Sequence, residues 1–189
     1  MSRDGVPVLD HDGVAEHAGQ LLKVSDFNFV DLPAVMPSLV QLLDLVGGSM
    51  PVSLDLKDVA ALDAVLDVVA DRNPDRLWLC HHDVEVVEDV CARGSGVQVV
   101  HSSRPDRMPD GPAVWVPRFA AMGGAAVNLR HMYWDAELVS LVHDAGMLAF
   151  GWDLQTADVL LSGFQLGLDA VFSDYTDVMV EVATWLAGS

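Results

Sequence analysis

The stretch GMLAFGWDLQTADVLLSGFQLGLDAVFSDYTD, residues 146–177, decides the fold. The apolar run at 147–152 predicts a strand, and the helical pattern that begins at Thr156 stops at Gly167. A second apolar run at 168–172 predicts another strand. Two short apolar strands on either side of one helix form a parallel βαβ unit. Polar and aromatic side chains cluster where both strands end.

The rest of the chain repeats this alternation about six times. Further strands are expected at 6–9, 51–57, 77–80, 97–100 and 125–129, and helices at 38–46, 58–72, 84–93, 113–122, 135–145 and 175–186, with a long loop at 12–33. Such alternation predicts an α/β fold with a parallel sheet, either doubly wound or a TIM-type (β/α) barrel. No glycine-rich phosphate loop follows a strand, and polar residues collect at strand ends. Both observations favour the barrel.

The length of the chain and its content of 51% hydrophobic and 20% charged residues predict one globular domain over residues 1–189. The net charge of −18 argues against nucleic acid and anionic membranes as partners. No apolar run approaches the roughly 18 residues of a transmembrane helix, and the polar start does not look like a signal peptide. Cys80 and Cys91 fit no metal or redox spacing. We therefore expect a cytoplasmic protein with two free thiols.

The strand at 51–57 carries a carboxylate and an ammonium group two residues apart. Asp55 and Lys57 share a face because strand side chains alternate, and in a barrel that face is the interior, with its last members at the carboxyl end. The chain has only one other lysine, Lys23. The pair suits a divalent cation at Asp55 and phosphate oxygens at Lys57. Taken alone, the strand favours an ion pair in which the two groups neutralise each other.

Four blocks of sequence together resemble the glycerophosphodiester phosphodiesterase family. They are RDGVPV through His11-Asp12, MPSL through Leu43, the strand LDLK at 54–57, and His143 to Gly146 leading to Trp152 and then GLDAV with Ser173-Asp174. They occur in the family's order and cover nearly the whole chain. The resemblance implies a barrel that hydrolyses glycerophosphodiesters to glycerol 3-phosphate and an alcohol, in lipid metabolism, with a divalent cation, Mg²⁺ or Ca²⁺, as cofactor.

The resemblance also implies roles for individual residues. His11 corresponds to one of two histidines in acid–base catalysis, where an imidazole accepts and returns a proton. Asp55 takes a metal-ligand position, Lys57 contacts phosphate, and Trp152 walls the pocket for a small-molecule glycerophosphodiester. Without the resemblance, His11 reads as a loop histidine and Trp152 as a core or rim aromatic.

The chain departs from the family in two ways. Asp55 stands where the family usually has glutamate, and the opening strands with H-R-G and E-x-D, which supply a second histidine and two more carboxylates, are absent. The expected fold is thus an incomplete TIM-type barrel lacking the first two strands. The unpaired edge strands of such a barrel can pair with those of a second copy, so we expect a homo-oligomer. One hypothesis is that Met1 lies inside a longer natural protein.

Two other functions stay open. A catalytically inactive, truncated remnant would bind a phosphorylated ligand at most, and a phospholipase of the same superfamily is disfavoured by the lack of apolar docking loops. His81, His82, His101 and His131 also fall at strand ends. A carboxyl-end rim collects polar residues in any barrel, so a structural role is favoured for each.

Overall fold

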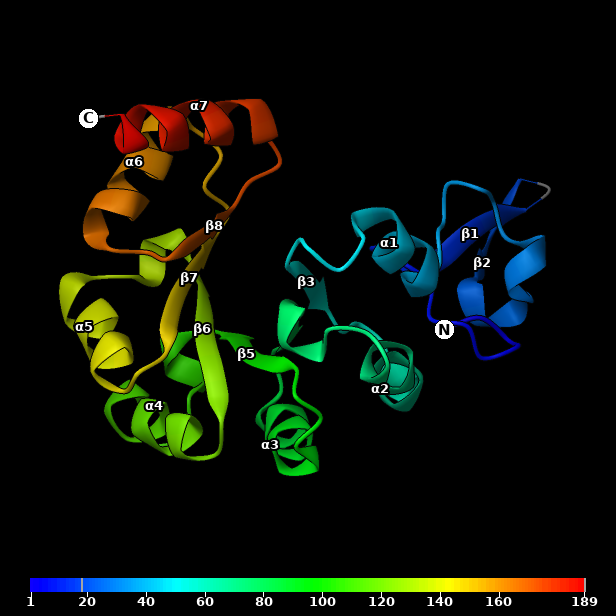
Figure 1. Ribbon diagram of the computed structural model, residues 1–189, viewed down its shortest axis with the longest axis horizontal. Coiled ribbons are helices and arrows are strands. Elements are labelled where there is room, and N and C mark those ends of the chain that lie inside the picture. The colour runs from blue at the N-terminus through cyan, green and yellow to red at the C-terminus, as the bar shows by residue number, and fades with distance from the viewer. Residues whose placement is uncertain (18, 189) are drawn as a thin grey trace. The chain divides into compact units, whose positions relative to one another are not determined.

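The computed structural model describes residues 1–17 and 19–188 and groups the chain into two compact units (Figure 1). The first unit comprises Met1–Cys80 and Gly94–Gln98, and the second comprises His81–Arg93 and Val99–Ser189. The single domain expected from composition stays a prediction.

The first unit combines an antiparallel hairpin with a parallel strand pair. Its strands are β1 (Val14–His17), β2 (Gln20–Lys23), β3 (Val52–Asp55) and β4 (Leu77–His81), and its α-helices are α1 (Leu39–Val46) and α2 (Leu62–Ala70). Short 3₁₀ turns lie at Val24–Asp26, Phe29–Asp31, Val59–Ala61 and Pro74–Arg76. Strand β3 pairs in parallel with β4, so that Asp55 lies opposite Cys80. The βαβ arrangement predicted from residue 51 onward is confirmed.

Two expectations about the N-terminal region were wrong. Residues 6–9 form no strand, because only Val8 pairs, in a single antiparallel bridge with Ser38. Pro7 lacks the N–H that a ladder needs. The expected loop at 12–33 contains the β1–β2 hairpin, in which Val14 lies opposite Lys23. Strands of four residues with little polar and apolar alternation give too weak a periodic signal to be recognised.

Helix α1 shows how local sequence sets the boundaries. The Ser38 side chain accepts a hydrogen bond from the Gln41 N–H at 3.2 Å, and the Gln41 side chain accepts one from the Ser38 N–H at 2.8 Å. This capping box starts the helix. Gly47 ends it in the left-handed conformation at φ 64°, which a residue with a Cβ adopts only at a cost.

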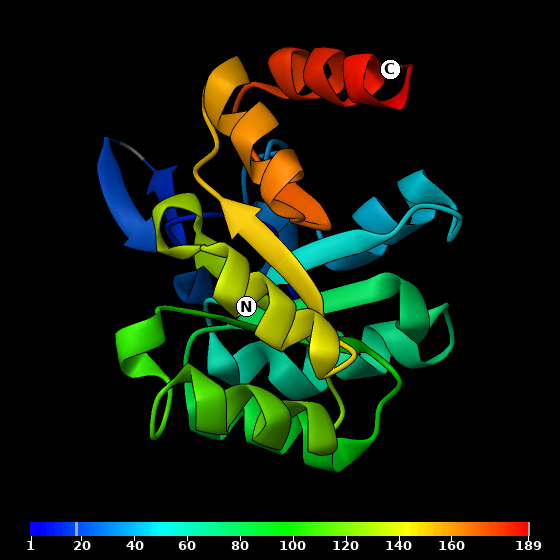
Figure 2. The ribbon, with the colours of Figure 1, turned by 90° about the vertical axis from the view of Figure 1, so that its left-hand side faces the viewer.

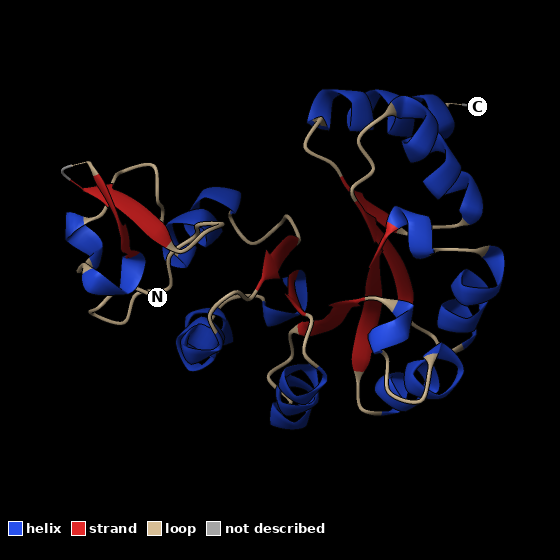
Figure 3. Cartoon of the chain, turned by 180° about the vertical axis from the view of Figure 1, so that it is seen from behind, coloured by secondary structure: helices blue, strands red, loops and turns tan. Residues whose placement is uncertain are grey.

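The second unit is a parallel four-stranded sheet in chain order, β5-β6-β7-β8. Its strands are β5 (Gln98–Ser103), β6 (Gly124–Arg130), β7 (Leu148–Trp152) and β8 (Ala170–Phe172), and its α-helices are α3 (Val84–Arg93), α4 (Pro112–Ala121), α5 (Ala136–Asp144), α6 (Ala157–Leu166) and α7 (Thr176–Ala187). Figures 1 and 3 show α4, α5 and α6 along one side of β6 and β7, and Figure 2 looks onto this helical layer.

The core of the second unit lies between that side of the sheet and helix α4. Trp115 and Phe119 of α4 are fully buried and stack with ring centroids 5.5 Å apart. His101 of β5 meets both rings edge-on. Gly124 on β6 leaves room for the Phe119 ring, since a Cβ there would come within 2.5 Å of it.

The strand order distinguishes the two architectures that the sequence left open. A doubly wound sheet reverses its strand order and carries helices on both faces. Here neighbouring strands follow chain order and the helices lie along one face (Figure 3). The fold is α/β, an incomplete TIM-type (β/α) barrel with the six strands β3 to β8, where a closed barrel has eight. Among the described residues, no helix has the length and hydropathy needed to cross a membrane.

Candidate active site

A cavity of about 550 Å³ lies in the first unit where β3 and β4 end. It is lined by residues 7–14, 23–25 and 54–58, together with Met1, Leu39, Ala61, Val65 and Leu79. His11, Asp55 and Lys57, which were predicted to share a site, therefore line one cavity. Active sites of TIM barrels form at the carboxyl ends of the strands, and this cavity has that position.

The strand geometry of β3 explains how the polar groups reach the cavity. Leu56 is buried, whereas Asp55 and Lys57 are about half-exposed, as the predicted alternation requires. The backbone N–H of Leu56 donates to the carbonyl of Cys80 at 2.9 Å, so pairing with the next strand continues past Asp55. This holds the Asp55 and Lys57 backbone in place at the edge of the cavity.

Asp55 and Lys57 form an ion pair with each other. Their side chains are 51% and 52% exposed, so the pair contributes only about 0–1 kcal/mol to stability. The self-neutralising pair that the sequence left open is therefore present. Because it is weak and solvated, a more highly charged anion can compete with Asp55 for the ammonium group.

His11 pairs with its neighbour Asp12. The Nδ1 atom of His11 lies 2.7 Å from Oδ1 of Asp12. A carboxylate only accepts, so Nδ1 carries the proton and Nε2 is the nitrogen left to exchange a proton with another molecule. The Asp10 carboxylate accepts from the N–H groups of Asp12 and Gly13 at 2.9 and 2.6 Å, which shapes the turn. His11 itself is 85% exposed.

The residues at this site do not fit the implied divalent cation. Among the side chains of residues 1–16 and 19–188, no group of three or more His, Cys, Asp or Glu is placed to hold a metal. Asp55 is the one predicted ligand, and its carboxylate is bound to Lys57. Mg²⁺ and Ca²⁺ require several oxygen ligands.

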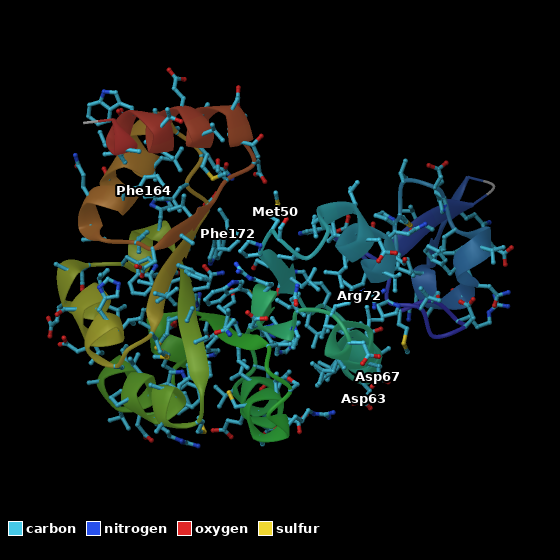
Figure 4. The ribbon with its side chains drawn as sticks, in the orientation of Figure 1. Met50, Asp63, Asp67, Arg72, Phe164 and Phe172 are labelled. Carbon is cyan, nitrogen blue, oxygen red and sulfur yellow. The ribbon has the colours of Figure 1, made fainter. Side chains whose placement is uncertain are left out.

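A second cavity of the first unit, of about 450 Å³, lies at the opposite ends of the same strands. It is lined by the first residues of β3 and β4, Val52 and Leu77, and by Met50 and Arg72, which are labelled in Figure 4. The amino ends of barrel strands serve stability more than catalysis. We therefore take the cavity that contains Lys57 as the candidate site.

Trp152 belongs to the second unit, at the end of β7. Its side chain is 39% exposed, and the guanidinium of Arg130 lies 5.9 Å from the centre of its ring. Arg130 also forms an ion pair with Asp153, the residue after Trp152. Trp152 is thus a partly exposed aromatic residue at a strand end, and the expectation that it walls the substrate pocket stays a prediction. Sequence reasoning missed Arg130, although it stands at a strand end like Trp152.

Three of the other strand-end histidines, His81, His82 and His101, have structural partners. His101 is fully buried and its Nδ1 accepts a hydrogen bond from the Trp115 indole at 2.8 Å. His81 accepts from the N–H of Asp83 at 3.0 Å and stacks on His82. Burial is the main reason that the pKa of His101 falls to about 4. His101 is therefore a neutral core residue.

Comparison with solved structures tests the resemblance seen in the motifs. No family model matches the chain, and no curated protein matches it. A structure named as that of a glycerophosphoryl diester phosphodiesterase from Silicibacter pomeroyi superposes with a TM-score of 0.82 at 18% identity, covering 99% of this chain and 81% of that one. This chain has the glycerophosphodiester phosphodiesterase fold.

Two further structures with this phosphodiesterase fold support the assignment. A phosphodiesterase from Oleispira antarctica, in complex with the product sn-glycerol-3-phosphate, has a TM-score of 0.79 at 18% identity and covers 97% of this chain and 82% of its own. A glycerophosphodiester phosphodiesterase from Agrobacterium tumefaciens has a TM-score of 0.68 at 14% identity, covering 94% and 82%. At these identities the likeness is one of fold.

Proposed function

We propose that the protein acts on glycerophosphodiesters, binding the phosphodiester group in the cavity of the first unit and releasing glycerol 3-phosphate and an alcohol. One observation carries the proposal. Both lysines of a chain with net charge −18 line the cavity that also contains His11. A surface this acidic repels phosphate almost everywhere, so an anion site needs local cations. The two lysines supply them, although Asp10, Asp12, Asp55 and Asp58 line the same cavity.

The proposed roles follow from the contacts. The Lys57 ammonium group leaves the Asp55 carboxylate and binds phosphate oxygens. A charge-assisted hydrogen bond to phosphate is stronger than a solvated surface ion pair. Leu39, Leu54 and Leu56 are apolar residues of the cavity lining, and we propose that this part of the lining lies beside the carbon part of the ligand. Trp152, in the second unit, is proposed to contact substrate as the resemblance implies.

Hydrolysis consumes one water molecule. Water adds to phosphorus, the bond from phosphorus to the alcohol oxygen breaks, and the proton lost by water balances the one gained by the alkoxide. We assign one of these proton transfers to Nε2 of His11, since Asp12 holds Nδ1 protonated. The divalent cation that the resemblance implies lacks a ligand set among the described side chains, and Asp55 alone is proposed as a ligand.

A second candidate function is binding of glycerophosphodiesters without hydrolysis. The pairing of Asp55 with Lys57, together with the incomplete ligand set, favours it. When the carboxylates that bind the metal are missing, the rate of hydrolysis falls more than the affinity for phosphate. The reason is that Lys57 is proposed to contact phosphate directly, without the metal.

Binding is measured by calorimetric titration with glycerol 3-phosphate for the wild type, Lys57→Gln, Lys23→Gln and Arg104→Gln. Arg104 is a matched control, since it also pairs with an exposed carboxylate, that of Asp106, but lies in the second unit. We expect Lys57→Gln to weaken binding by about 10-fold or more, the value of one charged hydrogen bond, and Arg104→Gln to leave it unchanged. An equal effect of both variants contradicts the proposal.

Release of glycerol 3-phosphate from glycerophosphocholine and glycerophosphoinositol, with and without Mg²⁺ or Ca²⁺, distinguishes the two functions. Release that disappears in His11→Ala supports hydrolysis. Binding that persists without release supports the second candidate, and the absence of both overturns the proposed function.

A cytoplasmic location and a homo-oligomer are part of the same proposal. Cys80 and Cys91 are both free thiols, which suits a reducing compartment. Light scattering on the protein as it elutes from a size-exclusion column measures its molar mass and so tests the oligomer. A monomer at micromolar concentration would refute it.

A further inference from the structure

The second cavity of the first unit, at the amino ends of β3 and β4, has an apolar wall and a charged rim. Its volume of about 450 Å³ lies within the range of pockets that hold small molecules. No histidine, cysteine, serine or threonine is among its lining residues, so its chemistry suits binding more than catalysis. The apolar wall comes from α1, α2 and the two strands and comprises Leu43, Val46, Met50, Val52, Val69 and Leu77.

Asn73 fixes the shape of this cavity. Its Nδ2 donates to the carbonyl of Gly48 at 3.1 Å and so joins the turn after α2 to the turn after α1. Gly48 has a φ of 68°, and a Cβ there would come within 2.8 Å of Asn73 Nδ2. Glycine permits both the left-handed backbone and this close approach. The cavity is therefore held open by specific contacts of the folded chain.

The basic residues of the first unit are concentrated at its two cavities. The unit contains five lysine and arginine residues against thirteen aspartate and glutamate residues. Lys23 and Lys57 line the first cavity, Arg72 and Arg76 line the second, and Arg3 lines neither. Cations in such an acidic unit create a local potential that differs from that of the rest of its surface. The second cavity thus combines two arginines with two lining carboxylates, Asp44 and Asp71.

Arg72 and Asp44 are already used by the fold. The Nη1 atom of Arg72 donates to the carbonyl of Val68 at 2.6 Å, and its Nη2 atom lies 3.5 Å from Oδ1 of Asp44. Arg72 therefore satisfies a carbonyl in the last turn of α2 and neutralises Asp44.

Arg76 and Asp71 are the charged lining groups that stay available to a ligand. Arg76 is 52% exposed, and the carboxylate with which it pairs, that of Asp75, is 3.9 Å from its Nε. Among the described residues, the structure shows no ion pair or side-chain hydrogen bond for Asp71, the residue that follows α2. The cavity therefore offers one guanidinium and one carboxylate, besides the apolar wall.

This combination selects one class of ligand. A dianionic phosphate would meet the repulsion of Asp44 and Asp71, and a simple amine would meet that of Arg72 and Arg76. A zwitterion presents both signs, so its carboxylate can bind a guanidinium while its ammonium group binds a carboxylate. An α-amino acid with an aliphatic side chain is a zwitterion that also has an apolar part for the wall.

We propose that the second cavity of the first unit binds an apolar α-amino acid. The ligand's carboxylate binds Arg76, its ammonium group binds Asp71, and its side chain lies against the wall that includes Val52 and Met50. This site is at the opposite ends of the strands from the cavity that contains Lys57, and it does not depend on the proposed function.

Calorimetric titration of the full chain with L-leucine and three analogues tests each contact separately. The compound 4-methylpentanoate lacks the ammonium group, 3-methylbutylamine lacks the carboxylate, and glycine lacks the apolar side chain. We expect leucine to bind with a Kd of about 1 mM or below. Each analogue should bind about 10-fold more weakly or worse, since each loses one charged hydrogen bond or the buried aliphatic group.

Variants with matched controls test the two charged residues. Arg76→Gln and Asp71→Asn should each weaken leucine binding by about 10-fold. Arg3→Gln is the control for the first variant, and Asp67→Asn is the control for the second, one turn earlier on α2 and labelled in Figure 4. Neither control residue lines the cavity, so neither substitution should change the affinity. All four residues are exposed, so these variants should fold.

The side-chain methyl group of Met50 reports where leucine binds. Met50 lines the cavity and is 61% exposed, whereas Met108 is buried in the second unit. In a protein labelled at its methionine methyl groups, leucine should shift the resonance of Met50, assigned with Met50→Leu, and leave that of Met108 in place.

Four results would overturn the inference. They are the absence of saturable leucine binding, an analogue that binds as tightly as leucine, an equal effect of a variant and its control, and a loss of leucine binding in Lys57→Gln. The last result would place the amino acid in the other cavity. Glycerol 3-phosphate binding that depends on Lys57 is measured separately, so the proposed function and the amino-acid site can each fail without the other.

Discussion

Substituting the buried His101 should change how stability depends on pH. His101 is fully buried, and its two ring nitrogens are used: Nδ1 accepts from Trp115 and Nε2 lies 3.3 Å from the carbonyl oxygen of His82. Protonation would remove the acceptor at Nδ1 and place a charge in the core. Burial, with a smaller contribution from His81, therefore lowers the pKa to about 4.

The sign follows from the two states. Between the ordinary pKa of 6.5 and the folded value of about 4, the unfolded chain binds a proton at residue 101 and the folded chain does not. The free energy of unfolding is thus highest above pH 6.5 and falls as the pH drops toward 4. Each pKa unit is worth about 1.4 kcal/mol, so the loss reaches about 2 kcal/mol at pH 5 and about 3 kcal/mol at pH 4.

Urea unfolding of the wild type and His101→Gln at pH 8.5, 7.5, 6.5, 5.5 and 5.0 measures this contribution. Glutamine keeps an oxygen that can accept from the Trp115 indole, but it does not titrate. The difference in unfolding free energy between the two proteins should shrink by about 2 kcal/mol from pH 7.5 to 5.0. Points between pH 7.5 and 8.5 are an internal control, where the two curves should run parallel.

Two results would refute the reasoning. Parallel curves down to pH 5.0 would mean that His101 titrates alike in the folded and unfolded chains. A wild type that gains stability over the variant as the pH falls would mean that His101 is charged in the folded core.

Local geometry predicts the effects of two further substitutions and the relative rates of one thiol reaction. Gly124→Ala should lower the free energy of unfolding by about 1–3 kcal/mol, because the new Cβ would meet the buried ring of Phe119; an unchanged urea midpoint would contradict this overlap. Ser38→Ala should cost about 1 kcal/mol through loss of the α1 capping box, and a stability unchanged within error would argue against the cap. Cys80, whose pKa burial raises to about 11, should react with Ellman's reagent at pH 8 more slowly than the half-buried Cys91; equal rates would contradict the burial.

Local signals predicted most elements of this protein. The helix expected at 84–93 is α3, and the strand and helix that begin with residues 147 and 156 are β7 and α6. These elements combine strong hydrophobic periodicity with clear stop residues such as Gly167. The hairpin at 14–23 was missed because its pairing depends on contacts between residues that carry no periodic pattern.

The sequence likewise predicted only part of the candidate site. Parity along β3 predicted that Asp55 and Lys57 share a face, and the motifs predicted that His11 accompanies them; all three line one cavity. Parity alone favoured the ion pair between Asp55 and Lys57, whereas the motifs favoured a metal ligand at Asp55; the structure contains the ion pair. The choice depends on which other carboxylates lie within reach, which neither parity nor motif encodes.

The sequence alone predicted the α/β alternation and three residues of the first-unit cavity, His11, Asp55 and Lys57, because periodicity, capping and motif spacing are local properties. Only the tertiary structure decided that His101 is a neutral core residue and that Arg130 is bound to Asp153 over Trp152. Arg130 and Asp153 are far apart in sequence, and the register of β6 against β7 brings them together. Whether a polar side chain is buried, paired or free depends on such long-range pairing, which no local pattern encodes.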